Sequence, residues 1–287
     1  MIPVIQLNNG QKMPQEGFGT FQITDFETCK NAVLKALALG YRLIDTAQVY
    51  RNERAVGAAL KLTTVPRADI FVTTKVWLPF FGDDVTAQSV ENSLQRMGLD
   101  YLDLVLLHEP YCDYYGAYRD LEKLVMVGKI KSIGVSNFDA GQLLDLSHQM
   151  KITPAVNQVE LNLYQQQTNL RKFQTENKIV IEAWAPLGEV NGSILQEPTV
   201  LQIAKKYHKT SAQVLLHYLV QLGAAIIPKA VQESHMRDNL AIWDFDFSAL
   251  EMRQLAILDK KKWLSPNRRA LSSTKHYMDL IDEGLDY

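Results

Sequence analysis

Four residues whose side chains can bind and release protons stand at or near the ends of short apolar segments. Asp45 ends YRLID, Lys75 ends IFVTTK and His108 ends LDLVLLH, while Tyr50 follows Asp45 by five residues. Together they offer an acid, a cation that lowers the pKa of the acid, a carboxylate that holds the cation, and an imidazole. This combination suits reversible proton transfer to a carbonyl oxygen.

Each of these residues taken alone has an ordinary structural explanation. Tyr50 suits a surface or rim position, Asp45 suits a helix N-cap ahead of Thr46, and His108 suits a hydrogen-bonded position in the core. Lys75 alone would be a solvated strand end. The functional interpretation therefore depends on an architecture that brings the four side chains to one place.

The composition excludes several classes of protein. The chain has 287 residues, 47% of them hydrophobic and 22% charged, with a net charge of −2. These values are typical of a globular domain and favour neither a nucleic-acid nor a membrane partner. No apolar run reaches the roughly 18 residues of a membrane span, and residues 1–10 do not resemble a secretory signal. With only Cys29 and Cys112, we expect a reduced, cytoplasmic setting.

Apolar segments alternate with helical patterns along most of the chain. Strand-like segments cover 16–20, 41–45, 70–74, 102–107, 129–135, 154–160, 179–184 and 224–228. Helical patterns lie near 25–39, 52–62, 86–97, 116–127, 139–150, 166–176, 197–207 and 211–221. The strand-like segments are nearly continuously apolar, as expected of parallel strands that are covered on both faces.

This alternation predicts an α/β fold, a (β/α)8 TIM barrel, in a single domain that spans residues 1–287. A doubly wound open sheet is the alternative, but no GxGxxG follows the first strand. The Asn-Asn-Gly at 8–10 predicts an N-terminal β-hairpin outside the main core. The residues from about 260 show no clear periodicity, which favours a C-terminal loop over the barrel mouth, or a partly disordered tail.

In such a barrel the carboxyl ends of all strands meet at one rim. The second, third and fourth strands would bring Asp45, Lys75 and His108 side by side there. Three later strands would end on the same rim with Gln158, Trp184, Pro228 and Lys229. The pattern of elements therefore predicts one site in which the candidate residues converge.

Several segments, in order along the chain, resemble those of the aldo-keto reductase family. They are GFGTF (17–21), DTAQVYRNERAVG (45–57), TTKVW (73–77), LVLLHEP (104–110), GKIKSIGVSNF (128–138), NQVELN (157–162), WAPLG (184–188) and IPKA (227–230). The resemblance runs from residue 17 to about 239. It implies a (β/α)8 barrel, a nicotinamide cofactor bound without a Rossmann domain, and reduction of a carbonyl to an alcohol.

The resemblance implies a role for each of the four residues. Tyr50 would be the proton donor, and Lys75 would lower its pKa. Asp45 would keep Lys75 charged, and His108 would orient the carbonyl oxygen of the substrate.

The resemblance also implies how the cofactor is held. Ser136, Asn137 and Gln158 would hold the nicotinamide carboxamide, and Trp184 stands where the family usually has a Tyr that stacks on the ring. Lys229 would reach the 2′-phosphate of the adenosine. Further cofactor contacts are expected from Gly19, Thr20, Pro186, Leu187, Ala230, His235 and Asn239.

Two of these positions depart from the family pattern. Ala230 replaces the usual Ser, and His235 replaces the Arg that grips the 2′-phosphate. Imidazole can stack on adenine but cannot make the bidentate contact of a guanidinium. We expect NADP(H) as the cofactor, with more use of NAD(H) than in a typical member.

Phe21, Trp77 and Glu109 are the expected substrate-binding residues. The carboxylate of Glu109 would disfavour acidic substrates by like-charge repulsion, or would turn away into a salt bridge at the rim. Residues after about 260 would form a flap that sets specificity. The implied substrates are small aldehydes and ketones, such as sugars, keto-sugars or methylglyoxal.

Two other classes of function remain as alternatives. A nicotinamide-binding regulatory subunit would keep the cofactor residues without significant turnover, although the complete set of four catalytic residues favours an enzyme. A metal-assisted isomerase lacks support, because no cluster of His and carboxylate residues has metal-ligand spacing. We expect no metal, no obligate protein partner and a monomer.

Overall fold

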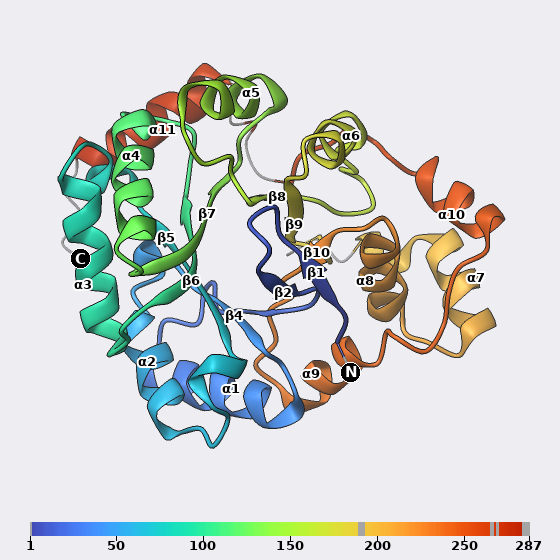
Figure 1. Ribbon diagram of the computed structural model, residues 1–287. Coiled ribbons are helices and arrows are strands. Elements are labelled where there is room, and N and C mark those ends of the chain that lie inside the picture. Colours follow the sequence, from blue (N-terminus) through green and yellow to red (C-terminus); the bar gives the residue numbers. More distant parts are fainter. Residues whose placement is uncertain (1, 189–192, 265–266, 268–269, 283–287) are drawn as a thin grey trace.

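The computed structural model describes residues 2–188, 193–264, 267 and 270–282 of the chain (Figure 1). Eight parallel strands follow one another in a single sheet, in the order of the sequence. They are β3 (Phe18–Gly19), β4 (Leu43–Asp45), β5 (Phe71–Val76), β6 (Leu102–Leu107), β7 (Ile130–Ser136), β8 (Val156–Glu160), β9 (Val180–Trp184) and β10 (Ala225–Ile226).

The two edges of this sheet meet at the segment that leads into β3. Glu16 forms a parallel bridge with Ile226 of β10. The Gly17 amide donates to the Ile226 carbonyl at 2.8 Å, and the Ile226 amide donates to the Gln15 carbonyl at 2.9 Å. The sheet is therefore closed into a barrel, and the predicted (β/α)8 fold is confirmed.

Helices surround the barrel between successive strands (Figure 1). They are α1 (Phe26–Leu39), α2 (Glu53–Leu62), α3 (Val85–Met97), α4 (Tyr114–Met126), α5 (Ala140–Gln149), α6 (Thr168–Glu176), α7 (Pro198–Tyr207) and α8 (Ser211–Gln221). Three more follow β10: α9 (Glu233–Leu240), α10 (Ala249–Ala256) and α11 (Leu271–Asp282). In the part of the chain that the structure describes, no helix combines the length and apolar character that a bilayer crossing needs.

The first helix shows how the sequence sets these elements. Helix α1 begins after Asp25, whose carboxylate accepts a hydrogen bond from the Thr28 amide at 2.8 Å. It buries Val33 and Leu37 on the face that packs on the barrel. It ends at Gly40, whose φ of 112° favours glycine.

The predicted N-terminal hairpin is present as β1 (Val4–Gln6) and β2 (Lys12–Pro14). The side-chain amide of Asn8 donates to the Pro154 carbonyl at 3.0 Å, just before β8. The side-chain amide of Asn9 donates to the Lys131 carbonyl at 3.1 Å, at the start of β7. The hairpin therefore covers the end of the barrel at which these strands begin.

The prediction that this hairpin lies outside the main core is wrong, because two of its side chains are buried with residues of the barrel interior. Leu7 and Met13 are buried in one cluster with residues of the barrel interior: Leu43, Leu104, Leu106, Val156 and Ala225. This cluster fills the barrel below the ends of the strands.

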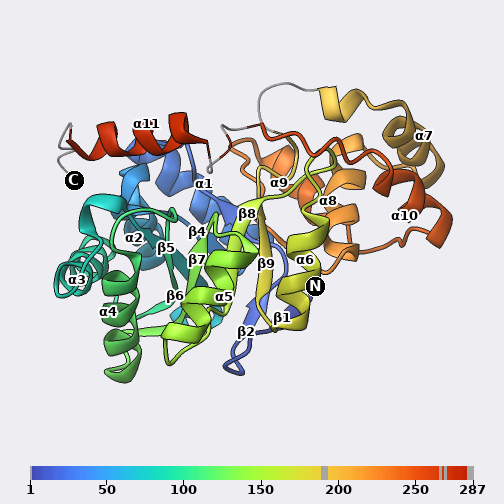
Figure 2. The same cartoon turned by 90° about the horizontal axis from the view of Figure 1, so that it is seen from above.

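The C-terminal tail differs from the expectation of a loop, because it contains α11. Figure 2 shows α11 on the side of the barrel away from the hairpin. The side chains of Tyr277, Leu280 and Ile281 pack against the core, and Ser273, one turn before Tyr277, is buried but polar. The apolar side chains that pack inward are confined to the second half of the helix, so the apolar stripe is too short for a clear helical pattern. Residues 265–266, 268–269 and 283–287, which belong to the predicted flap, lie outside the described residues.

Candidate active site

The barrel brings the four proton-transfer residues together at the ends of neighbouring strands. Asp45 ends β4, Lys75 lies near the end of β5, and His108 follows β6 directly. Tyr50 ends the short 3-10 helix η1 (Gln48–Tyr50), which begins three residues after β4. Parallel pairing of β4 with β5 and of β5 with β6 sets their relative heights at the rim.

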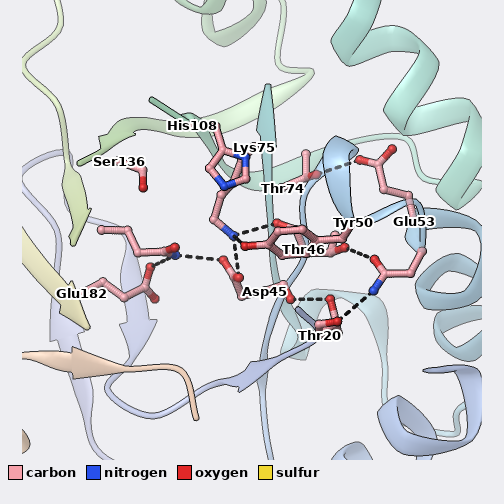
Figure 3. A network of polar contacts seen from close by, with 12 residues as sticks. Thr20, Asp45, Thr46, Tyr50, Glu53, Thr74, Lys75, His108, Ser136 and Glu182 are labelled. Atoms are coloured by element: carbon pink, nitrogen blue, oxygen red, sulfur yellow. Dashed lines mark hydrogen bonds and ion pairs between the residues drawn. The ribbon is translucent and has the colours of Figure 1, made fainter. Parts of the chain in front are cut away.

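The ammonium group of Lys75 lies between a carboxylate and a phenol (Figure 3). Lys75 Nζ is 2.6 Å from Asp45 Oδ1 and 3.4 Å from the hydroxyl oxygen of Tyr50. It also donates to the carbonyl of Thr46 at 2.9 Å. An ammonium has three hydrogens, so these contacts use all of its donors and fix its position.

The charged pair is buried, whereas the phenol and the imidazole are partly exposed. The side chains of Lys75 and Asp45 are 0% and 2% exposed. Tyr50 and His108 are half-buried. The arrangement thus presents a phenol and an imidazole to the barrel mouth, with a fixed positive charge behind the phenol.

The pKa of Tyr50 reflects two opposing effects. Burial has the larger effect and raises the pKa of Tyr50 to about 12, while the nearby Lys75 ammonium lowers it. The predicted influence of Lys75 is present, but it does not bring the pKa below its ordinary value. The phenol is still a much stronger acid than an alcohol, so it can protonate an alkoxide.

Lys75 keeps its positive charge in its buried position. Although burial disfavours the charge, the pKa of Lys75 is raised, chiefly by Asp45 and then by Tyr50. Burial also raises the pKa of Asp45, against the opposing effect of Lys75. Truncating one member of such a pair would leave an uncompensated charge in the core.

Aromatic rings form a wall around the phenol and the imidazole. The His108 ring centroid is 5.7 Å from that of Tyr50 and 5.2 Å from that of Trp77, both in edge-to-face geometry. The Phe21 ring centroid lies 5.0 Å from that of Tyr50. The predicted substrate-binding rings Phe21 and Trp77 therefore flank the proposed reacting groups.

Glu109 is buried next to this wall, with 3% of its surface exposed. Its carboxylate accepts a hydrogen bond from the Tyr277 hydroxyl of α11 at 2.9 Å. The Tyr277 ring also lies 6.1 Å from Trp77 and 5.1 Å from Tyr111. Glu109 therefore faces the tail that covers the mouth.

Ser136 and Asn137, two predicted cofactor residues at the end of β7, form hydrogen bonds that connect the ends of neighbouring strands. Asn137 has a left-handed backbone, with φ at 65°. Its side-chain nitrogen donates to the His108 carbonyl at 3.2 Å and to the Ser136 hydroxyl at 3.1 Å. Its side-chain oxygen accepts from the Trp184 indole at 2.9 Å, so Asn137 fixes the edge of the half-buried Trp184 ring.

Gln158 lies deeper, inside the barrel. Its side-chain nitrogen donates to Asp45 Oδ2 at 3.0 Å and to Glu182 Oε2 at 2.8 Å (Figure 3). Glu182 is fully buried and was missed by the sequence interpretation. The signal was present, because a glutamate in the apolar segment IVIEAW, two residues before Trp184, must point to the same side of the strand as Trp184.

Other predicted cofactor residues have structural contacts of their own. Gly19 passes so close to Ile227 that an added Cβ would lie 2.7 Å from its carbonyl oxygen, which explains the glycine. The buried Thr20 hydroxyl donates to the Asp45 carbonyl at 2.9 Å. Pro186 is buried and Leu187 half-buried in the loop after β9.

Asn52 connects the loops that carry Thr20 and Thr46. Its side-chain nitrogen donates to the Thr20 carbonyl at 2.9 Å, and its oxygen accepts from the Thr46 hydroxyl at 2.6 Å. Asn52 is not among the site residues predicted from the sequence. Its contacts hold in place the loops that position the Lys75 ammonium.

The residues predicted to meet the adenosine phosphate lie on and before α9. Lys229 and His235 are exposed, and Lys229 Nζ donates to the Gln22 side chain at 3.1 Å. Ala230 and Asn239 are buried. Gln232, the N-cap residue of α9, makes no capping bond from its side chain. Backbone amides at such a helix start favour anions.

The described residues contain no cluster of three or more His, Cys, Asp or Glu residues arranged to hold a metal ion. The cysteines Cys29 and Cys112 are both free.

Comparison with known proteins identifies the family. Residues 17–260 match the model of the aldo/keto reductase family. The chain is 40% identical to the glyoxal reductase of Bacillus subtilis, over 92% of this chain and 95% of that protein. It is 39% identical to the methylglyoxal reductase of Yersinia pestis, over 96% of this chain and 99% of that protein.

A solved structure agrees with these matches. A silkworm (Bombyx mori) aldo-keto reductase in complex with NADPH superposes with a TM-score of 0.88 at 35% identity, over 92% of this chain and 90% of that chain. The chain belongs to the aldo-keto reductase family, as its sequence motifs implied. It is an NADP(H)-dependent oxidoreductase that reduces carbonyl compounds.

Proposed function

We propose that this reductase acts on small, uncharged aldehydes and ketones, 2-oxoaldehydes among them, with Tyr50 as the proton donor. The observation that carries the proposal is the buried Asp45–Lys75 pair, whose ammonium lies 3.4 Å from the Tyr50 hydroxyl. A fixed positive charge beside a phenol stabilises the phenolate that remains after the proton has left.

The residues at the rim fit a nicotinamide dinucleotide phosphate. Trp184 offers a half-buried ring whose edge is fixed by Asn137. The two N–H groups of the Gln158 amide are both engaged, so its carbonyl oxygen is the atom left to accept from a carboxamide. Lys229 and the uncapped start of α9 suit a phosphate group. Bound NADPH supplies the hydride.

His108 and Tyr50 are the groups of this chain that would meet the carbonyl oxygen. Their rings are edge to face at 5.7 Å, so both can point a polar atom at one oxygen. The Trp77 indole N–H is buried and has no acceptor in the structure, so it is a further donor available to a polar substrate. Donors that are already in position cost no reorganisation when negative charge develops on that oxygen.

The walls of the pocket favour small and uncharged substrates. Phe21 and Trp77 flank the phenol, and Tyr277 of α11 covers Trp77. The carboxylate of Glu109 repels substrate carboxylates, and its charge contributes to the raised pKa of Tyr50, which places it near the reacting groups. Relatives named for glyoxal and methylglyoxal support this substrate class.

We further propose that the protein works in the cytoplasm on small molecules, without an obligate protein, nucleic-acid or membrane partner. The two free cysteines are consistent with a reducing compartment. The net charge of −2 favours no polyanionic partner.

The test follows the absorbance of NADPH at its reduced-nicotinamide band with glyoxal and methylglyoxal as substrates. We expect turnover in the wild-type protein, and a loss of roughly 100-fold or more in kcat for Tyr50→Phe, the range for removal of a general acid. The affinity for NADPH, measured by fluorescence titration, should stay within about twofold in this variant. Tyr101→Phe, a change of the same kind outside the site, is the matched control.

Two results would contradict the proposal. Undiminished turnover in Tyr50→Phe would exclude the phenol as the proton donor. Tight NADPH binding with no turnover of any aldehyde would instead support a nicotinamide-binding regulatory subunit.

A further inference from the structure

The Gln158 side chain joins two carboxylates that come from different strands. Its nitrogen donates to Asp45 Oδ2 of β4 at 3.0 Å and to Glu182 Oε2 of β9 at 2.8 Å (Figure 3). An amide nitrogen carries two hydrogens, and both are used here. The orientation of the Gln158 amide is therefore set by Asp45 and Glu182 together.

Among the residues that the structure describes, Glu182 forms no ion pair of its own, although the charge of Lys75 acts on it. Glu182 is fully buried, and its second oxygen, Oε1, has no hydrogen-bond partner among those residues. The nearest charges come from Asp45 of β4 and Lys75 of β5, and the Lys75 ammonium is bonded to Asp45 at 2.6 Å. On the other neighbouring strand, β10, the residue opposite Glu182 is Ala225. Two buried carboxyl groups thus share one ammonium.

Glu182 lies beneath the proposed nicotinamide position. It precedes Trp184 by two residues in β9, so both side chains point to the same face of the strand, about 7 Å apart along it. Its hydrogen-bonding partner Gln158 is the residue expected to meet the carboxamide. This placement rests on the proposed function described above.

We propose that Glu182 senses the redox form of the cofactor, by holding a proton when the nicotinamide ring is neutral and releasing it to solvent when the ring is cationic. A buried carboxylate without a counter-ion is unfavourable, and the positive ring of NADP⁺ supplies that counter-ion. The neutral ring of NADPH does not. Glu182 is a positioning residue, because it acts through Gln158 and through its charge.

The pKa of Glu182 lies near neutral pH, where a nearby charge can change its protonation. Burial raises its pKa to about 7, and the charge of Asp45 adds to this effect. Tyr50 and Lys75 do not change protonation near pH 7, since the pKa of Tyr50 is raised to about 12 and that of Lys75 is raised above its ordinary value. His108 is common to every variant compared below, so its contribution cancels in the comparison.

The protonation of Glu182 is thereby linked to the form of the cofactor that binds. A cationic ring lowers the pKa of Glu182, so NADP⁺ binding at about pH 7 expels a proton that NADPH binding leaves in place. Binding that releases a proton strengthens as the pH rises. The ratio of the Kd for NADP⁺ to the Kd for NADPH should therefore fall between about pH 6 and pH 8.

The experiment is calorimetric titration of NADP⁺ and of NADPH into the wild-type protein, Glu182→Gln and Glu16→Gln. Each titration is run at three pH values in buffers of different ionisation enthalpy, which counts the protons released. Glutamine at 182 keeps an acceptor for Gln158 and removes only the charge. Glu16 is the matched control, because it is also buried and burial also raises its pKa, to about 8, but it lies outside the site.

We expect the wild-type protein and Glu16→Gln to release more protons with NADP⁺ than with NADPH. In Glu182→Gln this difference disappears, and at pH 8 the preference for NADP⁺ over NADPH falls roughly tenfold, as expected of a unit charge acting across about 10 Å of protein.

Equal proton release with both forms in the wild-type protein would overturn the proposal, whether or not the glutamine variant folds. A difference that persists unchanged in Glu182→Gln would overturn it as well. Trp184→Ala separates this inference from the proposed function on which it rests. Suppose that Trp184→Ala weakens the binding of both cofactor forms, while Glu182→Gln leaves the ratio of their Kd values unchanged. The proposed nicotinamide position is then supported, and the proposed role of Glu182 is contradicted. If Trp184→Ala weakens neither form, both fail.

Discussion

At the scale of single residues, Glu109 is the side chain that most distinguishes this pocket from a purely aromatic one. It follows His108 directly, is buried, and accepts a hydrogen bond from Tyr277. A carboxylate in this position places negative charge close to the groups that are proposed to meet the substrate. Discrimination between substrates would then depend on charge repulsion as well as on fit.

This effect can be measured with glyoxal and glyoxylate, which differ in one aldehyde replaced by a carboxylate. We expect Glu109→Gln to raise kcat/KM for glyoxylate by roughly tenfold and to leave that for glyoxal nearly unchanged, because it removes a negative charge and keeps a hydrogen-bond acceptor. Steady-state kinetics with both substrates are the measurement. Tyr277→Phe removes the hydrogen bond without changing the charge, so it should not alter the ratio; an equal shift in both variants would contradict the electrostatic explanation.

Individual residues also show how far a sequence can be interpreted. The positions of Asp45, Lys75, Tyr50 and His108 follow from strand ends, and the structure places them in contact range. The net pKa of Tyr50 does not follow from the sequence, since it depends on how much burial opposes the charge of Lys75. The catalytic and cofactor roles of these residues remain predictions.

At the scale of elements, α9 is the feature on which we expect the choice between NADPH and NADH to depend. Its first turn carries His235, which is exposed, and its N-cap residue makes no side-chain capping bond. Backbone amides and Lys229 can hold a phosphate there, but an imidazole adds at most a single hydrogen bond to that binding. A guanidinium would add a bidentate charged contact.

We therefore expect His235→Arg to raise the ratio of kcat/KM for NADPH to that for NADH by roughly tenfold, since a charge-assisted hydrogen bond is worth about 1.5 kcal/mol or more. Kinetics with both cofactors and a saturating aldehyde give the ratio. His148→Arg, on the exposed face of α5, makes the same change of charge away from the site. A ratio that stays constant in His235→Arg, or that rises equally in His148→Arg, would count against this account.

The elements differ in how well their sequences indicate them. Strands such as β5 and β6 are buried at every residue, and helices such as α1 carry a clear apolar stripe, so local patterns were sufficient. Helix α11 could not be predicted in this way. Its inward face gains its contacts from Trp77 and Tyr111, which are distant in sequence.

At the scale of the whole molecule, buried carboxyl groups make stability depend on pH. Burial raises the pKa of Glu16 to about 8, although its carboxylate accepts a hydrogen bond from the Trp243 indole at 3.0 Å. In the unfolded chain a glutamate titrates near its model value of 4.5. Between these two values the folded protein binds more protons than the unfolded chain, so stability falls as the pH rises. Glu182 contributes with the same sign up to about pH 7.

We expect the free energy of unfolding to decrease from about pH 5 to pH 8 in the wild-type protein, and Glu16→Gln to flatten this decrease. Each tenfold difference in proton affinity corresponds to about 1.4 kcal/mol, so the change in slope should be measurable by urea denaturation. Glu251→Gln is the control, because the pKa of Glu251 is lowered to about 2 and its contribution is lost only at more acidic pH. A slope that Glu16→Gln leaves unchanged would show that Glu16 does not hold the proton.

The hairpin β1–β2 has one more consequence for the molecule. With Leu7 and Met13 seated among the interior side chains of the barrel, that end is sealed. All reactants must therefore enter at the other rim of the barrel. Phe21 at this rim is 44% exposed, while Gln158, deep inside the barrel, is 2% exposed. If the nicotinamide ring binds against Gln158 and Trp184, as proposed, the cofactor has to enter before the substrate and leave after the product. The hairpin at the closed end of the barrel, away from the proposed site, would thus set the order in which cofactor and substrate bind.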